Sequence, residues 1–439
     1  MTYAEAIQFL YDLRWFGTKF GLKNTVRLAA LAGNPQERLR FIHVAGTNGK
    51  GSTCAMLESI YRTSGLRVGL FTSPHLVSFG ERIQVNRKPL EQEEVVRLVT
   101  GMKPLLAQFS AEEHPTFFEV VTVMALQYFA TQKCGLVIWE TGLGGRLDAT
   151  NIVTPLASVI TNIHYDHQKW LGETLAGIAS EKAGIIKPGV PIITGADAPE
   201  AVKVIEETAR MNHAPLTRVM PAESDASPLD RLQLPLPGRH QRMNAAVALA
   251  VVRKLASLLP VSESSIQDGL SNVYWPGRLQ LVTTKSGQKI LLDGAHNLGG
   301  AEILATALKE NFGSMKPALV LGVLQDKDWT GMCRLLAPLV SRILLVPVHS
   351  ERSAEPHGLA EVCRESNPNA VVTEHASLEE ALREAAHEQF MAIAGSLYLV
   401  GEAMELLDMG AAKGSEERGL NEWNVAGAPS KPKPVAKEG

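Results

Sequence analysis

The sequence predicts an α/β protein with two domains: a phosphate-loop-containing first domain with a mostly parallel sheet, and a smaller Rossmann-like domain after it. Three observations predict this. Short apolar runs alternate with helical patterns through most of the chain, as in β-α-β units. The alternation restarts late in the sequence. Finally, 439 residues are too many for one ordinary hydrophobic core.

The first domain is predicted from apolar runs that read as buried strands. They cover residues 41–45, 67–71, 136–139 and 157–160. A glycine-rich turn after the first run leads into a helix at about 52–64. Residues 1–17 carry Glu5 and Asp12 among apolar side chains, which indicates an amphipathic helix and not a signal peptide.

The second domain is predicted from the later runs. They cover residues 290–292, 318–323, 343–348, 370–372 and 391–393. A Pro-Gly turn before them marks the boundary. We therefore expect domains at 1–275 and 285–413, a hinge at 276–284, and a disordered tail at 414–439, where large apolar side chains are few.

Composition narrows the class of protein. Hydrophobic residues make up 45% and charged residues 20% of the chain, which is the balance of a soluble globular protein. The formal net charge of -3 gives no reason to expect nucleic acid as a partner, and no apolar run is long enough to span a membrane. The four cysteines lack disulfide or zinc-finger spacing, so we expect a cytoplasmic protein. We also expect a monomer.

Residues 46–52, Gly-Thr-Asn-Gly-Lys-Gly-Ser, form the first candidate site. They follow a predicted strand and open a helix, where backbone N–H groups and the helix N-terminus can bind phosphate oxygens. Lys50 would reach the β- and γ-phosphates of a nucleotide, and Ser52 would ligate Mg²⁺. The loop departs from the standard pattern, because Val44 replaces the first glycine and Gly51 separates Lys50 from Ser52. A plain tight turn is the alternative.

Polar residues also follow two predicted strands that are consecutive along the chain, at the strand ends where ligands bind in open α/β sheets. Glu140 ends the run 136–139 and can hold Mg²⁺ beside a nucleotide, with a helix cap or a solvated charge as the alternative. Asp166 and His167 follow the next strand, and Asp166 can orient the imidazole of His167.

A helix is predicted between Thr174, as its N-cap, and Gly184, as its C′ residue. Lys182 lies in its last turn, where a cation facing the helix dipole is the plain reading. Elsewhere, Ser73 follows the run 67–71 and can cap a turn or bind a metal. Asp293 and the residues after it follow a strand of the second domain and would face the cleft if the domains close.

Together these motifs resemble the folylpolyglutamate synthase/dihydrofolate synthase family, relatives of the Mur ligases of cell-wall synthesis. They run in the family's order from about residue 20 to 400 and are specific as a set. The motifs are GTNGKGS (46–52), TSPHL (72–76), TFFE (116–119), GLGGRLDATN (142–151), DHQKWLGETLAGIASEKAGIIKPG (166–189), HQRMNAA (240–246), PGRLQ (276–280) and DGAHN (293–297).

The resemblance implies a role for each matched residue. The ATP-binding residues would be Gly49, Lys50, Gly51, Ser52, Thr53, Asn244, Arg278, Asp293 and His296. The ligands of two Mg²⁺ ions would be Ser52, Ser73, Glu140 and His167. The folate or pterin pocket would comprise Gly21, Leu22, Thr116, Phe117, Phe118, Glu119, Leu147, Asp148 and Ala149. The catalytic residues would be Lys50, His167 and Lys182, and Lys182 matches the lysine that is carbamylated in the family.

The implied reaction joins L-glutamate to dihydropteroate, to reduced folates, or to both, through an acyl phosphate made from ATP. A monovalent cation would be a further cofactor. Residues 147–149 and 116–119 look like the versions in bifunctional bacterial enzymes, although Asp148 and Glu119 can also be simple caps. Thr141 and His164 depart from the family's usual Val and Gly, and neither is a proposed ligand.

Three alternatives stay open at this point. A Mur-type UDP-muramoyl amino-acid ligase is the nearest rival. A phosphate-loop nucleotide switch would not need a second α/β domain that carries DGAHN. A dinucleotide-binding oxidoreductase lacks the G-x-G-x-x-G pattern that should open a helix after an early strand.

Overall fold

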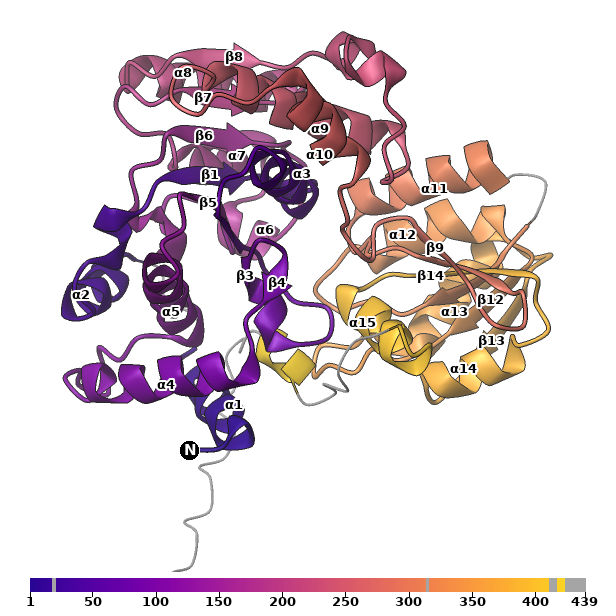
Figure 1. The fold of residues 1–439 in the computed structure, drawn as a ribbon. Coiled ribbons are helices and arrows are strands. Elements are labelled where there is room, and N and C mark those ends of the chain that lie inside the picture. Colours follow the sequence, from indigo (N-terminus) through magenta and orange to yellow (C-terminus); the bar gives the residue numbers. More distant parts are fainter. Residues whose placement is uncertain (18–20, 313–315, 410–416, 423–439) are drawn as a thin grey trace, which may run out of the picture.

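The computed structural model describes residues 1–17, 21–312, 316–409 and 417–422. Two α/β units lie side by side, the first coloured indigo to red and the second orange to yellow in Figure 1. Each unit contains one sheet with helices packed on it. The predicted fold class is therefore confirmed.

The first unit holds an eight-stranded sheet in the order β4-β3-β2-β5-β1-β6-β7-β8. Strands from β2 to β8 in this order are parallel, whereas β3 and β4 add antiparallel pairs at one edge. The strands are β1 (Phe41–Ala45), β2 (Val68–Phe71), β3 (Ile83–Val85), β4 (Lys88–Pro89), β5 (Leu136–Glu140), β6 (Ala157–Ile160), β7 (Ile192–Thr194) and β8 (Leu216–Arg218). The carboxyl ends of β2, β5, β1 and β6 consequently lie side by side.

Helices cover both faces of this first sheet. They are α1 (Tyr3–Asp12), α2 (Lys23–Leu31), α3 (Lys50–Thr63), α4 (Gln92–Leu106), α5 (Phe117–Thr131), α6 (Gln168–Leu171), α7 (Leu175–Ala183), α8 (Pro199–Met211), α9 (Arg239–Lys254) and α10 (Glu263–Ser271). Helices α1, α2, α4 and α5 pack against one face, and α3, α9 and α10 against the other. Short 3₁₀-helices include η3 (Phe79–Arg82) and η4 (Ala149–Ile152).

The second unit holds a six-stranded sheet in the order β13-β12-β11-β14-β10-β9, parallel except for the pair β9 and β10. Its strands are β9 (Gln280–Thr283), β10 (Lys289–Leu292), β11 (Ala318–Leu321), β12 (Arg342–Leu345), β13 (Val371–Glu374) and β14 (Phe390–Ala394). Its helices are α11 (Leu298–Phe312), α12 (Trp329–Leu336), α13 (Pro356–Ser366), α14 (Leu378–Glu384) and α15 (Leu397–Leu406).

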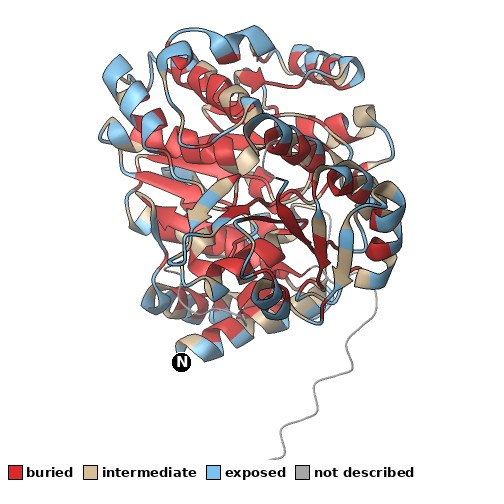
Figure 2. Cartoon of the chain, turned by 90° about the vertical axis from the view of Figure 1, so that its right-hand side faces the viewer, coloured by how far each residue is buried: buried red, intermediate tan, exposed pale blue. Residues whose placement is uncertain are grey.

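Burial on both faces explains why the central strands read as continuous apolar runs. All five residues of β1 are buried. Phe41 packs with the α5 side of the sheet, whereas Ile42 and Val44 pack with the α3 side. Figure 2 shows the buried strands enclosed by helices whose outer faces are exposed.

The predicted elements match these strands and helices to within a few residues, with two local differences. Helix α3 already begins at Lys50, because Gly49 adopts a left-handed conformation (φ 82°) directly before it. Thr174 caps α7 as expected. Gly184 is not in the left-handed conformation of a C′ glycine (φ -62°). Glycine is needed at this position because a Cβ on residue 184 would collide with the backbone of Arg146.

The predicted domain limits stay predictions. The structure does describe part of the predicted hinge and part of the predicted tail. Residues 280–283 of the predicted hinge form β9, which pairs with β10 and thus belongs to the second sheet. The prediction of a disordered tail is wrong for 417–422. These residues include the 3₁₀-helix η8 (Glu417–Asn421), and its Leu420 is only 1% exposed in the core beside α1. Positions 414–416 and 423–439 lie outside the described residues.

We predict that Gly269→Ala weakens the packing of α10 on α3, the helix that follows the glycine-rich loop. A Cβ at Gly269 on α10 would lie 2.6 Å from the Cα of Ile60 on α3, so the two helices would have to separate. Overpacking of this kind costs about 1–3 kcal/mol of unfolding free energy, measurable by urea denaturation. Gly101→Ala on α4 is the control, because no atom lies within 4 Å of the place that its added methyl group would take. Equal urea midpoints for the two variants would contradict the prediction.

Candidate active site

A cavity of about 330 Å³ lies between the two units, at the carboxyl ends of their parallel strands. The first unit lines it with the glycine-rich loop, the loops after β2, β5 and β6, and the start of α5. The second unit lines it with residues that follow β10, β11, β12 and β14. Both sheets therefore contribute their ligand-binding edge to one site.

The glycine-rich loop is fixed by contacts with the exit of β6. The N–H of Thr47 donates to the carbonyl of Asn162 (3.0 Å), and the N–H of Asn48 donates to Asn162 Oδ1 (2.8 Å). Gly46 and Gly49 have φ values of 152° and 82°, which side chains rarely tolerate. The loop thereby exposes the N-terminus of α3 to the cavity, in the geometry that binds anions.

Two lysines meet at the base of this loop. Lys50 Nζ donates to the carbonyls of Gly46 (3.1 Å) and Thr47 (3.2 Å). Lys182 Nζ, from the last turn of α7, donates to the same Gly46 carbonyl (2.9 Å). Burial, together with the nearby charge of Lys50, lowers the pKa of Lys182 to about 7. Lys182 therefore points into the cavity, and its amine is partly neutral near pH 7.

Glu140 is the last residue of β5, and it pairs in register with Val44 of β1, the strand that leads into the loop. It is buried, and its Oε2 accepts a hydrogen bond from the N–H of Ser73 (3.1 Å). Burial raises the pKa of Glu140 to about 7, although the charge of Lys50 opposes this shift. A buried carboxylate of this kind is stabilised in its charged form by any cation that enters the cavity.

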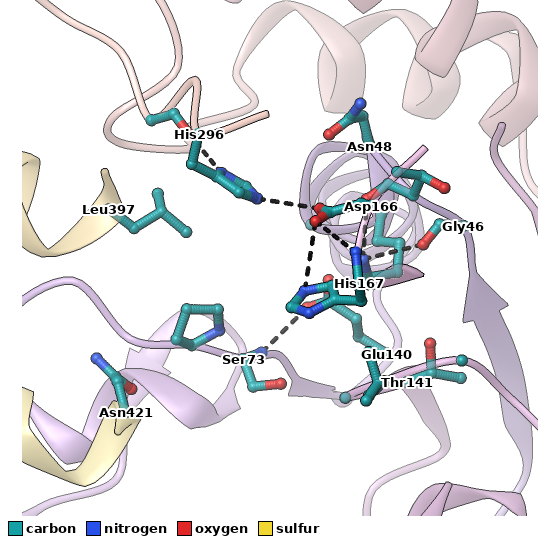
Figure 3. Close-up of a pocket in the computed structure, with 18 of the residues that line it drawn as sticks. Gly46, Asn48, Ser73, Glu140, Thr141, Asp166, His167, His296, Leu397 and Asn421 are labelled. Atoms are coloured by element: carbon teal, nitrogen blue, oxygen red, sulfur yellow. Dashed lines mark hydrogen bonds and ion pairs between the residues drawn. The ribbon is translucent and has the colours of Figure 1, made fainter. Parts of the chain in front are cut away.

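Asp166 lies where the two units meet beside the glycine-rich loop (Figure 3). Three side chains of the second unit surround its carboxylate. Lys327 Nζ lies 2.6 Å from Oδ1, Asn297 Nδ2 donates to Oδ2 (2.9 Å), and His296 Nε2 lies 3.7 Å from Oδ2. Asn297 also bonds Asn48 of the glycine-rich loop (3.0 Å). The second unit is thus docked beside the glycine-rich loop.

His167 follows Asp166 and has a left-handed backbone (φ 50°) that turns its ring into the cavity. Burial lowers its pKa to about 3, and the charges of Lys327 and His296 add to this effect against that of Asp166. The imidazole is therefore neutral at physiological pH, the form that can bind a metal.

Two further carboxylates of the first unit line the cavity, Glu119 and Asp148, and both already accept hydrogen bonds from the backbone. Glu119 Oε2 accepts from the N–H of Thr116 (2.8 Å), which completes a capping box at the start of α5. Asp148 accepts from the N–H of Leu143 (2.7 Å) and of Thr150 (3.0 Å), and so caps η4. The sequence analysis gave helix capping as the alternative role of Glu119 and Asp148, and the structure contains both caps.

Asp293 organises the second unit's side of the cavity. Its Oδ1 accepts from the N–H of Ala295 (2.9 Å), and its Oδ2 accepts from the N–H of Leu279 (2.8 Å). Arg278 lies partly buried beside it, and burial lowers the pKa of that guanidinium while Asp293 opposes the shift. The carboxylate thus holds the Pro-Gly turn against the end of β10.

Nearly all the predicted site residues line this one cavity. They are Gly21, Gly49, Lys50, Gly51, Ser52, Ser73, Thr116, Phe117, Phe118, Glu119, Glu140, Leu147, Asp148, Ala149, His167, Lys182, Asn244, Arg278, Asp293 and His296. Leu22 and Thr53 do not line it. Thr53 is fully buried in α3, so a direct nucleotide contact from its side chain has no support here.

Several lining residues were not predicted from the sequence. They include Arg82, Lys327, Arg352, Tyr398 and residues 420–422. Lys327 and Tyr398 follow the strands β11 and β14, so the strand-end rule that singled out Glu140 was a usable signal for them. Arg82 and residues 420–422 carry no such local signal.

Some classes of site are not formed by the part of the chain that the structure describes. No three His, Cys, Asp or Glu side chains come together there as a ready metal site. The four cysteines are buried and form no disulfide. None of the described helices is long and apolar enough to cross a membrane.

Comparison with known proteins agrees with this geometry. The Mur ligase middle domain model matches residues 44–252, and the model of the Mur ligase glutamate ligase domain matches residues 277–397. The dihydrofolate synthase/folylpolyglutamate synthase of Bacillus subtilis is 36% identical over 427 residues, which cover 92% of this chain and 99% of that protein.

Solved structures give the same result. The folylpolyglutamate synthase of Thermotoga maritima superposes with a TM-score of 0.81 at 34% identity, covering 95% of this chain and 98% of that one. FolC of Escherichia coli in complex with DHPP and ADP gives a TM-score of 0.81 at 32% identity, covering 93% and 98%. This chain, with its interdomain cavity and glycine-rich loop, belongs to the folylpolyglutamate synthase/dihydrofolate synthase family of the Mur ligases.

Proposed function

We propose that this chain is an ATP-dependent ligase that forms an amide between L-glutamate and the carboxylate of a folate-type acid. The observation that carries the proposal is the single cavity in which a phosphate-binding loop, a buried carboxylate and an apolar pocket meet. The relatives support it, since they are named dihydrofolate and folylpolyglutamate synthases, and one was solved with ADP and DHPP. ATP is accordingly the co-substrate.

The chemistry proceeds in two steps. The γ-phosphoryl group of ATP moves to the substrate carboxylate and gives ADP and an acyl phosphate. The glutamate amine then attacks the acyl carbon and loses a proton, and the tetrahedral intermediate expels phosphate. Backbone N–H groups at Gly49–Ser52 hold the ATP phosphates, and Lys50 exchanges its two carbonyl partners for phosphate oxygens. The protein's contribution is positioning and charge stabilisation in a buried cavity.

The acid substrate would lie on the α5 side of the cavity. Phe117, Phe118 and Leu147 line this part, next to Asp148. Aromatic and aliphatic side chains suit a flat pterin ring, and Asp148 can accept hydrogen bonds from its N–H groups. Burial raises the pKa of Asp148, while its hydrogen bonds from Thr150 and the Leu143 backbone favour the charged form.

We further propose that Ser52, Ser73, Glu140 and His167 hold two Mg²⁺ ions together with the ATP phosphates. The residues fit this group, because Glu140 is a buried carboxylate and His167 is a neutral imidazole on the same cavity wall. Mg²⁺ usually binds through one or two carboxylates plus substrate phosphates. When bound, it neutralises charge on the transferred phosphoryl group. A monovalent cation is proposed as an additional ion.

Lys182 is proposed to carry a carbamate. Its neutral amine can add to CO₂, so that an N–C bond forms, a proton is released and the side chain becomes an anion. The pKa of about 7 makes this neutral amine available at physiological pH. An anion at this position would compensate the positive charge of Lys50 and of bound metal ions.

The same site is proposed to accept both dihydropteroate and glutamylated reduced folates, since the phosphoryl chemistry of the two reactions is identical. We also propose a monomer located in the cytoplasm, in keeping with four unpaired cysteines.

A Mur-type ligase for UDP-muramoyl substrates is the less supported candidate, because the relatives that match over most of the chain carry folate names. A nucleotide switch does not account for the second unit's share of the cavity.

We predict that the purified protein, with ATP, Mg²⁺ and L-glutamate, glutamylates both dihydropteroate and tetrahydrofolate but not a UDP-muramoyl acid. Mass spectrometry identifies the products, and ADP release measures the rate. Lys50→Ala is the control that lacks the loop cation and should form no product while keeping its circular dichroism. Glutamylation of tetrahydrofolate alone would reduce the protein to a polyglutamate synthase. Product from only the muramoyl acid would contradict the proposal.

We predict that Glu140→Gln raises the Mg²⁺ concentration for half-maximal rate roughly tenfold or more, the scale seen when the environment of a metal site is perturbed. In the wild type, Mg²⁺ affinity should increase as pH rises through about 7, because Glu140 ionises in that range. The variant should lose this dependence. His167→Ala should shift the Mg²⁺ titration in the same direction. Superimposable titrations of both variants and the wild type would refute the shared metal site.

We predict that Lys182→Ala lowers kcat roughly 100-fold, the scale for losing one charge-stabilising group, and that formate or acetate partly restores activity. Wild-type protein kept free of CO₂ should lose activity and, at equal concentrations of dissolved CO₂, regain it faster at pH 8 than at pH 6, because more of the amine is neutral. Carbon-13 NMR with labelled CO₂ measures the adduct directly. Full activity without CO₂ and no carbamate signal would rule the modification out.

A further inference from the structure

The segment 417–422 returns from the second unit to the first. It comes after α15 in sequence, yet it packs against α1 and η3, near the bottom of the first unit in Figure 1. Leu420 belongs to the apolar core beneath α1, and a Cβ on Gly419 would collide with the hydroxyl of Tyr11. We call these six residues the strap.

The strap is held to the first unit by hydrogen bonds at both of its ends. The N–H of Phe79 donates to Glu417 Oε2 (2.6 Å), and His75 Nε2 lies 2.9 Å from the carbonyl oxygen of Glu417. At the other end, Asn421 Nδ2 donates to the carbonyl of His75 (2.9 Å). All four of these residues are at most 9% exposed, so the contacts are shielded from water.

These contacts fix the position of Arg82. Its Nε donates to His75 Nδ1 (2.8 Å), which requires His75 to carry its proton on Nε2 and to donate that proton to the strap carbonyl of Glu417. Its Nη2 donates to Asn421 Oδ1. Arg82 is 3% exposed and lines the cavity. The strap therefore holds this guanidinium both directly and through His75.

The last strap residue holds a second arginine, this time from the second unit. Arg352 Nε donates to Glu422 Oε2 (3.1 Å), and its other nitrogens reach Asp326 (3.3 Å) and the hydroxyl of Tyr398 (3.3 Å). The side chain of Glu422 is 6% exposed, and its Oε1 is buried without a hydrogen-bond partner. Arg352, Tyr398 and Glu422 all line the cavity.

We propose that the strap is part of the substrate site: Asn421 and Glu422 position Arg82 and Arg352, one from each unit, to bind a carboxylate of a co-substrate. The proposal rests on the proposed ligase function. The phosphate loop already accounts for the phosphates of ATP, so the anions left for these two guanidinium groups are carboxylates. Guanidinium binds carboxylate with fixed geometry, and the unpartnered Glu422 Oε1 can accept an N–H from the same ligand.

Two co-substrates carry such a carboxylate: L-glutamate and the folate-type acid. Asn421→Ala and Glu422→Gln keep the apolar anchor Leu420 but remove the groups that hold the arginines. We expect each variant to raise KM for one of these co-substrates about tenfold or more, the effect of leaving a buried polar group unpaired, with KM for ATP unchanged. A rise for L-glutamate alone assigns the arginines to the incoming amino acid, and a rise for the folate substrate alone assigns them to the acid.

Gly419→Ala tests docking of the strap without altering any pocket residue. The added methyl group collides with Tyr11, so the strap should be displaced and the same KM should rise. The matched control is Gly101→Ala on α4, where the added methyl meets no neighbour and every KM should equal that of the wild type. Thermal unfolding of all four variants and ligand-induced shifts of the melting temperature, with L-glutamate and with tetrahydrofolate, accompany the kinetics.

Unchanged KM values in folded Asn421→Ala and Gly419→Ala, or an equal rise of KM for ATP, would overturn the proposal and leave the strap a packing element. Failure of the ligase assignment looks different, because the wild-type protein itself would then form no glutamylated product. A wild type that makes product, combined with variants whose KM for a carboxylate co-substrate rises selectively, supports the strap as part of the site.

Discussion

Three side chains of the second unit meet the buried carboxylate of Asp166, and this contact holds the two halves of the cavity together. Asn297 and Lys327 bond it directly, and Asn297 continues to Asn48 of the glycine-rich loop. A buried carboxylate left without these partners would be costly, so the first unit is strongly biased towards the docked arrangement. Domain docking and the shape of the glycine-rich loop are consequently linked through Asn297.

The cavity's chemistry follows from the desolvation that this docking produces. The same burial raises the pKa of Glu140 to about 7 and lowers that of Lys182 to about 7, because in each case it disfavours the charged form. Near pH 7 the charge of each side chain therefore depends on what binds beside it, such as a cation, a phosphate or CO₂. Such poised groups are typical of active sites that handle transferring charge in a dry environment.

A second link between the two units runs through the strap. Its residues bond His75 and Arg82 in the first unit and Arg352 in the second. The two units thus meet at two places that line the cavity, at Asp166 beside the glycine-rich loop and at Glu422 beside the arginines. Phosphate binding and recognition of the other substrates would share one rigid frame, which suits a reaction that must align three molecules.

The sequence by itself determined the two sheets and most of the cavity. Parallel strands buried on both faces must be continuous apolar runs, and residues such as Glu140, His167 and Asp293 follow these runs, so a local rule places them at the ligand-binding edge. Glu119 and Asp148 were likewise predictable as caps, because capping depends on residues two or three positions away. Contacts between distant segments were decided only by the tertiary structure. Arg82 meets Asn421 across 339 positions, and Lys327 meets Asp166 across 161. The strap has one large apolar side chain, Leu420, and its order comes from polar partners that the fold brings to it. No local pattern encodes such partners, because the free energy of these contacts exists only once both units have folded and docked.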